Sequence, residues 1–279
     1  MTLFLRDDIA AIWPEAQAFA CAAGQEGEVF RAREGRRTLR FVANGKSYFL
    51  KYHAGIGWKE ILKNLSQAKW PVVSAMSEVR AIEAVTQAGL DTMTLAAYGE
   101  RGSNPARIES FVVTDDLVDT LSLEDAAHLW GGKPPVRLKR QLIRRLAQIA
   151  RRMHAAGVNH RDFYLCHFLI KQTDFDAGNF DAPLYLIDLH RAQLRTSVPK
   201  RWLVKDLGGL YFSAAPLALT RTDLLRFVRD YSGCRPAQAV RDQTSLWRAI
   251  RREGERLYGR HYQQAARLPL PYQPVHKEQ

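Results

Sequence analysis

The segment VNHRDFYLCHFLI, residues 158–170, contains the most chemically suggestive group of side chains in the sequence. Asp162 follows a histidine and an arginine in this segment, and a carboxylate so placed can orient an acceptor hydroxyl and take its proton. A second aspartate, Asp188, ends the apolar run LYLID. A carboxylate oxygen is a hard ligand that suits magnesium. We expect both aspartates to serve phosphoryl transfer, which needs positioning and charge neutralisation more than covalent help.

Two further residues precede these aspartates in the order that this chemistry requires. Lys51 lies near the end of the β-like run SYFLKYH, and Glu78 lies on the helix predicted after it. In the protein-kinase pattern such a lysine holds the α- and β-phosphates of ATP, and such a glutamate orients the lysine. Glu83 is a rival for the role of Glu78, and HRD alone could arise by chance in an arginine-rich chain. The ordered set is much harder to obtain by accident, so ATP and Mg²⁺ are the predicted cofactors.

The sequence departs from the protein-kinase pattern in two places. His167 stands five residues after Asp162, where those kinases place a metal-binding asparagine. Imidazole is a poorer magnesium ligand than oxygen, so His167 is either a second metal ligand or has another role. The glycine-rich GxGxxG loop is also missing, and REGRRT connects the first two predicted strands instead. We expect Arg36, Arg37 or the backbone amides near Gly35 to cover the phosphates.

The elements that position these residues form a strand-rich part followed by a helix-rich part. Turn sequences EGRR and ANGK separate three short β-like runs, which predicts an antiparallel meander over 28–33, 38–42 and 47–52. One or two short helices are expected within 1–24. The other predicted elements of the first part are helices at 54–70 and 74–88 and strands at 94–99 and 108–114. The helix-rich part has predicted helices at 119–130, 136–156 and 200–262, the last with breaks near Pro216 and Pro236.

Composition and charge narrow the class of protein. The chain has 279 residues, of which 46% are hydrophobic and 25% charged, values that argue against disorder and against a disulfide-rich miniprotein. The formal net charge of +12 indicates an anionic partner without choosing one. Three cysteines without a CxxC spacing favour a reducing cytoplasm. No apolar run approaches 18 residues, so we expect any membrane contact to be peripheral.

The sequence resembles the bacterial lipopolysaccharide core heptose(I) kinases of the WaaP/RfaP type, small members of the protein-kinase-like superfamily. The resemblance covers roughly residues 3–265, in stretches such as GKSYFLKYH, GIGWKEILKNL, HAAGVNHRDFYLCHFLI and LIDLHRAQLRT. It implies ATP-dependent phosphorylation of the first heptose of the lipopolysaccharide inner core, at the cytoplasmic face of the inner membrane. It also implies that Asp162 is the catalytic aspartate, Asp188 a magnesium ligand and Lys51 the phosphate-binding lysine, with Glu78 as its partner. Asp206, in KDLGGLYF, resembles the aspartate that supports the catalytic loop from a helix.

The expected fold class is therefore α+β, with a protein-kinase-like bilobal architecture. We predict a sheet-rich N-lobe over 1–114, a mostly helical C-lobe over 115–268 and an extended tail over 269–279. ATP is expected between the lobes, with a hinge near 114–117.

Several alternatives for acceptor and partner stay open. A kinase of this fold could act on another core sugar or on a small soluble substrate, and a catalytically dead scaffold is disfavoured because Lys51, Asp162 and Asp188 are all present. A nucleic-acid-binding protein is also disfavoured, because the basic residues are dispersed and no recognised motif is present. Six arginines within 136–156 form either a solvated face or a surface for anionic lipid or an acidic protein such as an acyl carrier protein. Residues 55–70 either pack on the first lobe or lie at the membrane interface.

Overall fold

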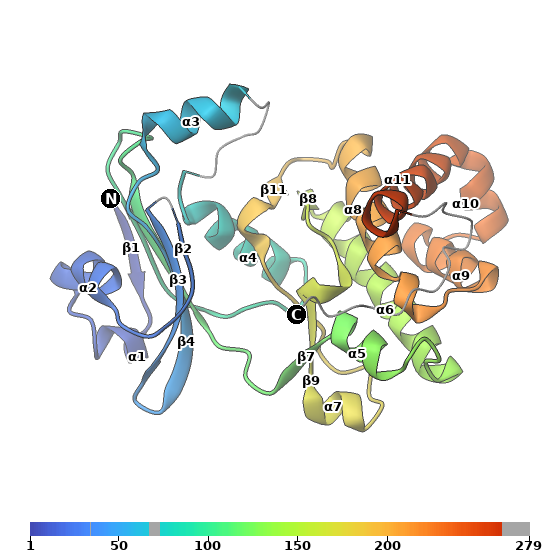
Figure 1. Ribbon diagram of the computed structural model, residues 1–279, viewed down its shortest axis with the longest axis horizontal. Coiled ribbons are helices and arrows are strands. Elements are labelled where there is room, and N and C mark those ends of the chain that lie inside the picture. The colour runs from blue at the N-terminus through green and yellow to red at the C-terminus, as the bar shows by residue number, and fades with distance from the viewer. Residues whose placement is uncertain (34, 67–72, 264–279) are drawn as a thin grey trace. The chain divides into compact units, whose positions relative to one another are not determined.

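The computed structural model describes residues 1–33, 35–66 and 73–263, and these divide into two compact units (Figure 1). The strand-rich unit comprises Met1–Glu83, Met93–Val118 and Asp188–Arg191, without the undescribed positions. The helix-rich unit comprises Ala84–Thr92, Asp119–Ile187 and the described residues from Ala192 onward. Each unit is therefore discontinuous in sequence, whereas the predicted lobes are continuous. The predicted tail, 269–279, lies outside the described residues.

A six-stranded antiparallel sheet forms the centre of the strand-rich unit, in the order β1-β5-β6-β4-β3-β2. The predicted meander is confirmed, because β2 pairs with β3 and β3 with β4. Asn44 and Gly45 join β3 to β4 with positive φ angles of 50° and 73°, as a two-residue type I′ hairpin requires. The strands are β1 (Thr2–Leu5), β2 (Glu28–Arg33), β3 (Arg36–Ala43), β4 (Lys46–His53), β5 (Leu95–Arg101) and β6 (Glu109–Asp115).

The prediction of helices throughout residues 1–24 is wrong for the first of these elements. Thr2–Leu5 is an edge strand that pairs with β5, and Arg6 then bonds to Asp115 at the end of β6, at 2.6 Å. Four residues are too few to show a strand period, and pairing with a strand more than 90 residues away is invisible to local patterns. The predicted helices follow the strand as α1 (Asp7–Ala10), a 3₁₀ turn (Glu15–Gln17) and α2 (Ala18–Gly24).

Helix α4 (Met76–Gln87) brings a carboxylate to the sheet. Its apolar residues Met76 and Val79 pack with Val112 of β6, and Glu78 lies between them on the first turn. The division between the units falls within this helix, after Glu83. The predicted helix at 54–70 is α3 (Gly57–Ser66), and residues 67–72 lie outside the described chain. Helix α3 buries Ile61 but leaves Trp58 and Leu62 more than half exposed.

The helix-rich unit is organised around α6 (Val136–Ala155), whose predicted apolar stripe is buried from Leu142 to Met153. The predicted helix at 119–130 is wrong in its first residues: Thr120–Ser122 is strand β7, and the hydroxyl of Ser122 caps α5 (Leu123–Leu129). Short strands surround the loop of interest, namely β8 (Val158–Asn159), β9 (Phe168–Lys171), β10 (Tyr185–Leu186) and β11 (Gln193–Leu194). The remaining helices are α7 (Gln172–Asp176), α8 (Lys200–Ser213), α9 (Arg221–Ser232), α10 (Pro236–Asp242) and α11 (Thr244–Tyr262).

A cavity of about 470 Å³ lies among α6, α8, α9, α10 and α11. Leucine, isoleucine, valine and aromatic side chains dominate its lining, so it contains few groups that could bind phosphate or move a proton. Within the described part of the chain, no helix is both long and apolar enough to cross a bilayer.

Candidate active site

Lys51 and Glu78 form the ion pair that their order in the sequence predicts. The Nζ atom of Lys51, on β4, lies 2.7 Å from Oε1 of Glu78 on α4. The Glu78 side chain is only 3% exposed, whereas the rival Glu83 is exposed on the same helix. Burial by itself would lower the pKa of Lys51, but the carboxylates of Glu78 and Asp188 outweigh it and raise the pKa above its ordinary value. Lys51 is therefore a fixed cation.

Asp188 joins this pair although it lies 137 positions after Lys51. Its Oδ1 atom is 3.5 Å from Nζ of Lys51 and 2.6 Å from Nδ1 of His190. The backbone of Asp188 has a φ of 62°, a left-handed conformation that is uncommon for a residue other than glycine. His190 was not predicted as a site residue, and its only signal in the sequence is its position two residues after Asp188. The strand-rich unit thus assembles one ammonium group and two carboxylates.

A buried aspartate in the helix-rich unit holds the backbone of the HRD segment. Asp206, on α8, is fully buried, and its two oxygens accept the backbone N–H groups of His160 and Arg161, both at 2.8 Å. Nε2 of His154 lies 3.3 Å from the same carboxylate. The predicted supporting role of Asp206 is confirmed, because it bonds to the two residues that precede Asp162.

Two histidines fix the backbone of Asp162 on both sides. The N–H of Asp162 donates to Nδ1 of His160 at 3.3 Å, and Nδ1 of His167 donates to the carbonyl oxygen of Asp162 at 2.6 Å. Nε2 of His160 also donates to the carbonyl of Ile187, the residue bonded to Asp188, at 2.9 Å. His160 thus has a structural role in this loop. His167 stabilises the loop, and its role as a metal ligand stays a prediction.

Arg37 and Gly35 both have structural partners in the strand-rich unit. The guanidinium of Arg37 donates to the carbonyl of Ala23 at the C-terminal end of α2, at 2.7 Å. Gly35 has a φ of 73°, and a Cβ atom there would lie 2.6 Å from the carbonyl oxygen of Gly55, so only glycine fits this turn. Contact of either residue with ATP stays a prediction.

His53, on β4, is a further residue beside Lys51 that no pattern in the sequence singles out. It follows Lys51 by two positions on β4, which places both side chains on one face of the sheet. Its Nδ1 atom is buried and has no hydrogen-bond partner among the described residues. Burial, followed by the positive charges of Arg36 and Lys51, lowers the pKa of His53 to about 3. The imidazole is therefore neutral in the folded protein, and only the tertiary structure reveals this.

We predict that His53 makes the protein sensitive to acid. The unfolded chain binds a proton on this histidine below about pH 6.5 and the folded chain does not, so stability falls as the pH drops from 6.5 towards 3. At pH 5, binding of this proton to the unfolded chain lowers the free energy of unfolding by about 1–2 kcal/mol. Urea unfolding at pH 7 and pH 5 should show that His53→Gln loses less stability on acidification than the wild type by this amount. Replacing the exposed His261 is the control, and equal losses in all three proteins would contradict the prediction.

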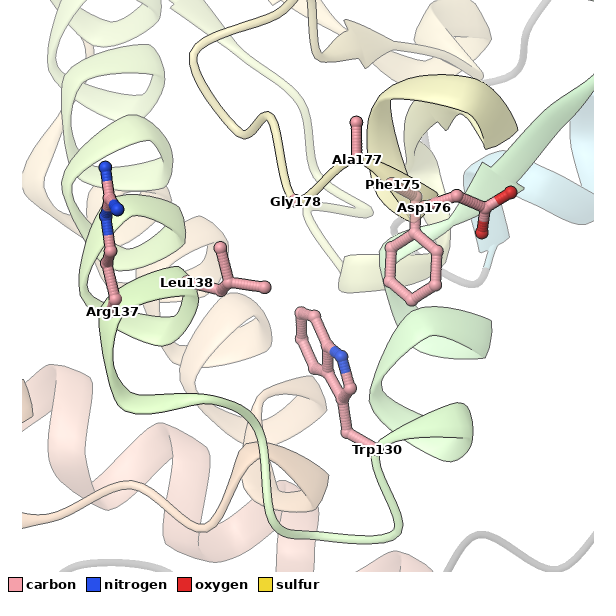
Figure 2. A pocket seen from close by; sticks show the side chains of 7 residues that line it. All are labelled: Trp130, Arg137, Leu138, Phe175, Asp176, Ala177 and Gly178. Carbon is pink, nitrogen blue, oxygen red and sulfur yellow. The ribbon is translucent and has the colours of Figure 1, made fainter.

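A cavity of about 570 Å³ in the helix-rich unit has none of these residues in its lining (Figure 2). Leu138 points towards Trp130 across it, and Phe175 contributes a second aromatic ring (Figure 2). Its charged lining residues are Arg137 and Asp176. Since neither belongs to the sets assembled around Lys51 or Asp206, we do not place the phosphoryl-transfer chemistry in this cavity.

The α+β, protein-kinase-like fold, the Lys51–Glu78 ion pair and the HRD segment define the class of protein as a kinase. Comparison with known sequences gives the family: residues 22–231 match the Lipopolysaccharide kinase (Kdo/WaaP) family, and the chain belongs to it. It is 48% identical over 261 residues to the lipopolysaccharide core heptose(I) kinase WaaP of Pseudomonas aeruginosa, covering 93% of this chain and 97% of that protein. It is also 48% identical over 230 residues to the Escherichia coli K12 protein of the same name, covering 82% and 86% of the two chains.

A solved structure supports the assignment of the fold. The structure described as "WaaP in complex with acyl carrier protein" superposes with a TM-score of 0.79 and 42% sequence identity, covering 92% of this chain and all of that chain. The sequence-based predictions of the family and of the fold class are confirmed by these similarities.

Proposed function

We propose that this chain transfers the γ-phosphoryl group of ATP to a hydroxyl of the first heptose in the lipopolysaccharide inner core. The observation that carries the proposal is the grouping of Lys51, Glu78 and Asp188 in a chain of the Lipopolysaccharide kinase (Kdo/WaaP) family. The relatives that bear the name heptose(I) kinase match over most of this chain, which favours the same acceptor.

Lys51 is the residue that we assign to the phosphates of ATP. Glu78 accepts a hydrogen bond from Nζ of Lys51 and is almost completely buried, so it limits the positions available to the ammonium group. A cation held in place before the nucleotide binds requires little reorganisation when phosphate oxygens approach. Charge on the transferred group can then be stabilised without covalent help from the protein.

Asp188 is suited to hold Mg²⁺ together with the phosphates of ATP. Magnesium sites in phosphotransferases commonly use one or two carboxylates, with phosphate and water oxygens completing the coordination. Within the described chain, no group of three or more His, Cys, Asp or Glu side chains is placed to hold a metal ion. Oxygen atoms of phosphate and water would therefore complete the coordination. The carboxylate of Asp188 is half-buried and lies beside Lys51, the residue that we assign to the same phosphates. The ion would neutralise phosphate charge when bound.

Asp162 is the residue that we assign to the acceptor hydroxyl. Its backbone is fixed through His160 and His167, and Asp206 holds the two residues before it. A carboxylate on such a restrained loop can orient a hydroxyl and take its proton as the phosphoryl group transfers.

A transfer assay with matched acceptors tests this function. The acceptors are purified inner-core glycolipid with its first heptose, the same glycolipid without heptose, and free soluble sugars, each with radiolabelled ATP. We expect label only on the heptose-containing glycolipid, and mass spectrometry should locate one added phosphate on the first heptose. Equal transfer to free sugars, or transfer to the heptose-free glycolipid, would overturn the proposed acceptor.

We propose that the chain acts at the cytoplasmic face of the inner membrane through peripheral contact. Helix α3 supports this, because Trp58 and Leu62 are 55% and 61% exposed and have lysines beside them in the sequence. An exposed apolar surface flanked by positive charge is typical of binding at an anionic lipid interface. Buried Ile61 packs with Ile56 and Ala106, so the helix also has the packing role that we considered as the alternative.

We propose an acyl carrier protein as the acidic partner. The solved structure described as WaaP in complex with acyl carrier protein supports this choice, as does the net charge of +12. The surface that suits an acidic partner is a cavity of about 790 Å³ beside the C-terminal end of α6 and the turn between α9 and α10. It contains a single carboxylate, that of Asp230, and four arginines: Arg151, Arg152, Arg229 and Arg235.

Reversing charge in this cavity should weaken binding of the acyl carrier protein. We expect the double variant Arg151→Glu, Arg235→Glu to raise the dissociation constant at least tenfold, because opposite charges across the interface become like charges. Isothermal titration calorimetry at low and high salt measures this. The matched control reverses the exposed Arg252 and Arg260 of α11. Equal weakening by both double variants would show that only the overall charge matters and would contradict this site.

A further inference from the structure

Four cationic side chains surround a single tryptophan in the helix-rich unit. Trp202 lies on the first turn of α8, and the charged groups of four residues lie 5.1 to 5.6 Å from its ring centroid. These residues are Arg161, Arg195, Arg201 and Lys205, and we call the five residues the Trp202 cluster. Attraction between a cation and the face of an aromatic ring stabilises such contacts. Mutual repulsion among four positive charges opposes it.

Three of the four cations, those of Arg195, Arg201 and Lys205, form no ion pair with any described residue. Arg195 donates to two neutral side chains, the amides of Asn159 and Gln193. Arg201 and Lys205 are exposed and form no ion pair with any described residue. Glu253 is close enough to Lys205 for that lysine to contribute to its lowered pKa, but its oxygens bond to Arg256.

The buried carboxylate nearest in sequence to the cluster is also engaged elsewhere. Asp206 accepts the backbone N–H groups of His160 and Arg161, and a third contact comes from His154. In addition, the Nε1 atom of Trp202 is buried and has no partner among the described residues. A buried donor without a partner is costly, and an acceptor atom supplied by a ligand would remove that cost.

The cluster adjoins the loop assigned to catalysis through one of its own members. Arg161 is bonded to Asp162, and its φ of 76° is a left-handed conformation, which a residue other than glycine adopts at some cost in energy. The carboxylate of Asp206 accepts the backbone N–H groups of His160 and Arg161, and these two hydrogen bonds hold Arg161 in that conformation. Arg161, a positively charged member of the cluster, is therefore the direct neighbour of Asp162 in the sequence.

We propose that the Trp202 cluster binds an acidic group of the acceptor glycolipid, a carboxylate or a phosphate, next to the hydroxyl that is phosphorylated. This inference rests on the proposed function. Guanidinium groups bind both kinds of anion through paired hydrogen bonds. An inner-core acceptor carries sugar carboxylates and lipid phosphates, and both repel ATP. Cations that hold one of these groups offset that repulsion and leave Asp162 to act on the neutral hydroxyl.

Removing two of the exposed cations tests the site by steady-state kinetics. We expect the double variant Arg201→Ala, Lys205→Ala to raise KM for the glycolipid about tenfold, with KM for ATP and kcat changed less than twofold. The effect falls on KM because the anion is bound equally before and during transfer. The double variant Arg252→Ala, Arg260→Ala removes the same charge from α11 and should keep both KM values. An unchanged acceptor KM in the Trp202-cluster variant, or the same rise in the control, overturns the proposal.

Chemically altered acceptors distinguish the two sources of the anion. One acceptor has its sugar carboxylates esterified and another has its lipid phosphates removed. The alteration that removes the bound group should raise KM about tenfold for the wild type and leave KM of the Trp202-cluster variant unchanged. If neither alteration distinguishes the two proteins, the cluster does not bind the anion of the acceptor and the proposal fails.

A binding measurement tests the anion site independently of the proposed reaction. Calorimetric titration of inner-core glycolipid into the protein without ATP requires no phosphoryl transfer. If transfer is never detected but the wild type binds glycolipid about tenfold more tightly than the Trp202-cluster variant, the proposed reaction fails and the anion site stands. Equal binding by the two proteins overturns the anion site, whatever the transfer assay shows.

Discussion

Replacing Asp162 with alanine should lower kcat for transfer to the glycolipid by about 10²- to 10⁴-fold, the usual contribution of a positioned proton acceptor. KM for ATP should change little, because we assign the phosphates to Lys51 and Asp188. Asp162→Asn should lose nearly as much, since an amide keeps the shape of the side chain but cannot take the proton. The backbone contacts of residue 162 with His160 and His167 involve main-chain atoms of this residue, so both variants should keep the structure of the loop.

Kinetics of the purified variants and mass spectrometry of the core oligosaccharide from cells that carry them measure this effect. The expected result in cells is the loss of one phosphate group from the core. The control is Asp181→Ala, which removes an exposed aspartate of the same unit. Asp162→Ala with kcat near that of the control, at an unchanged melting temperature, would show that this carboxylate does not serve the reaction.

Breaking the Lys51–Glu78 pair should affect both catalysis and stability. We expect Lys51→Met to lower kcat/KM for ATP by about 10²- to 10³-fold, as loss of a prearranged electrostatic group does. It should also destabilise the fold by about 3 kcal/mol, because the Glu78 carboxylate, 3% exposed, then lacks its cation. Glu78→Gln should lower kcat/KM less, since Lys51 keeps its charge but loses its orientation.

A double-mutant cycle separates these two effects. The double variant Lys51→Met, Glu78→Gln should recover part of the stability that Lys51→Met loses, because no buried carboxylate remains unpaired, and it should recover none of the activity. Urea unfolding and ATP kinetics on the four proteins of the cycle measure both. Glu83→Gln, on the exposed face of the same helix, is the control for Glu78. Additive stability losses in the cycle would mean that the two groups do not interact in solution.

The features that the sequence predicted correctly depend on neighbours along the chain. Alternation and the Asn44–Gly45 turn define the meander, and a 3.6-residue period defines α6. The segment around Asp162 is recognised from consecutive letters, and the order of Lys51, Glu78 and Asp188 indicates their chemistry. Local conformational preference is enough for such features, because the residues concerned are already close in the chain.

Only the tertiary structure decided which side chains from distant segments meet and which of them lose contact with water. It pairs Thr2–Leu5 with β5 and brings Asp188 to Lys51. It also buries His53 so that its pKa falls to about 3, and it collects four cations around Trp202. Contacts between distant segments and the energies of charges near them depend on how whole elements pack. That packing is a property of the complete chain, and no window of sequence contains it.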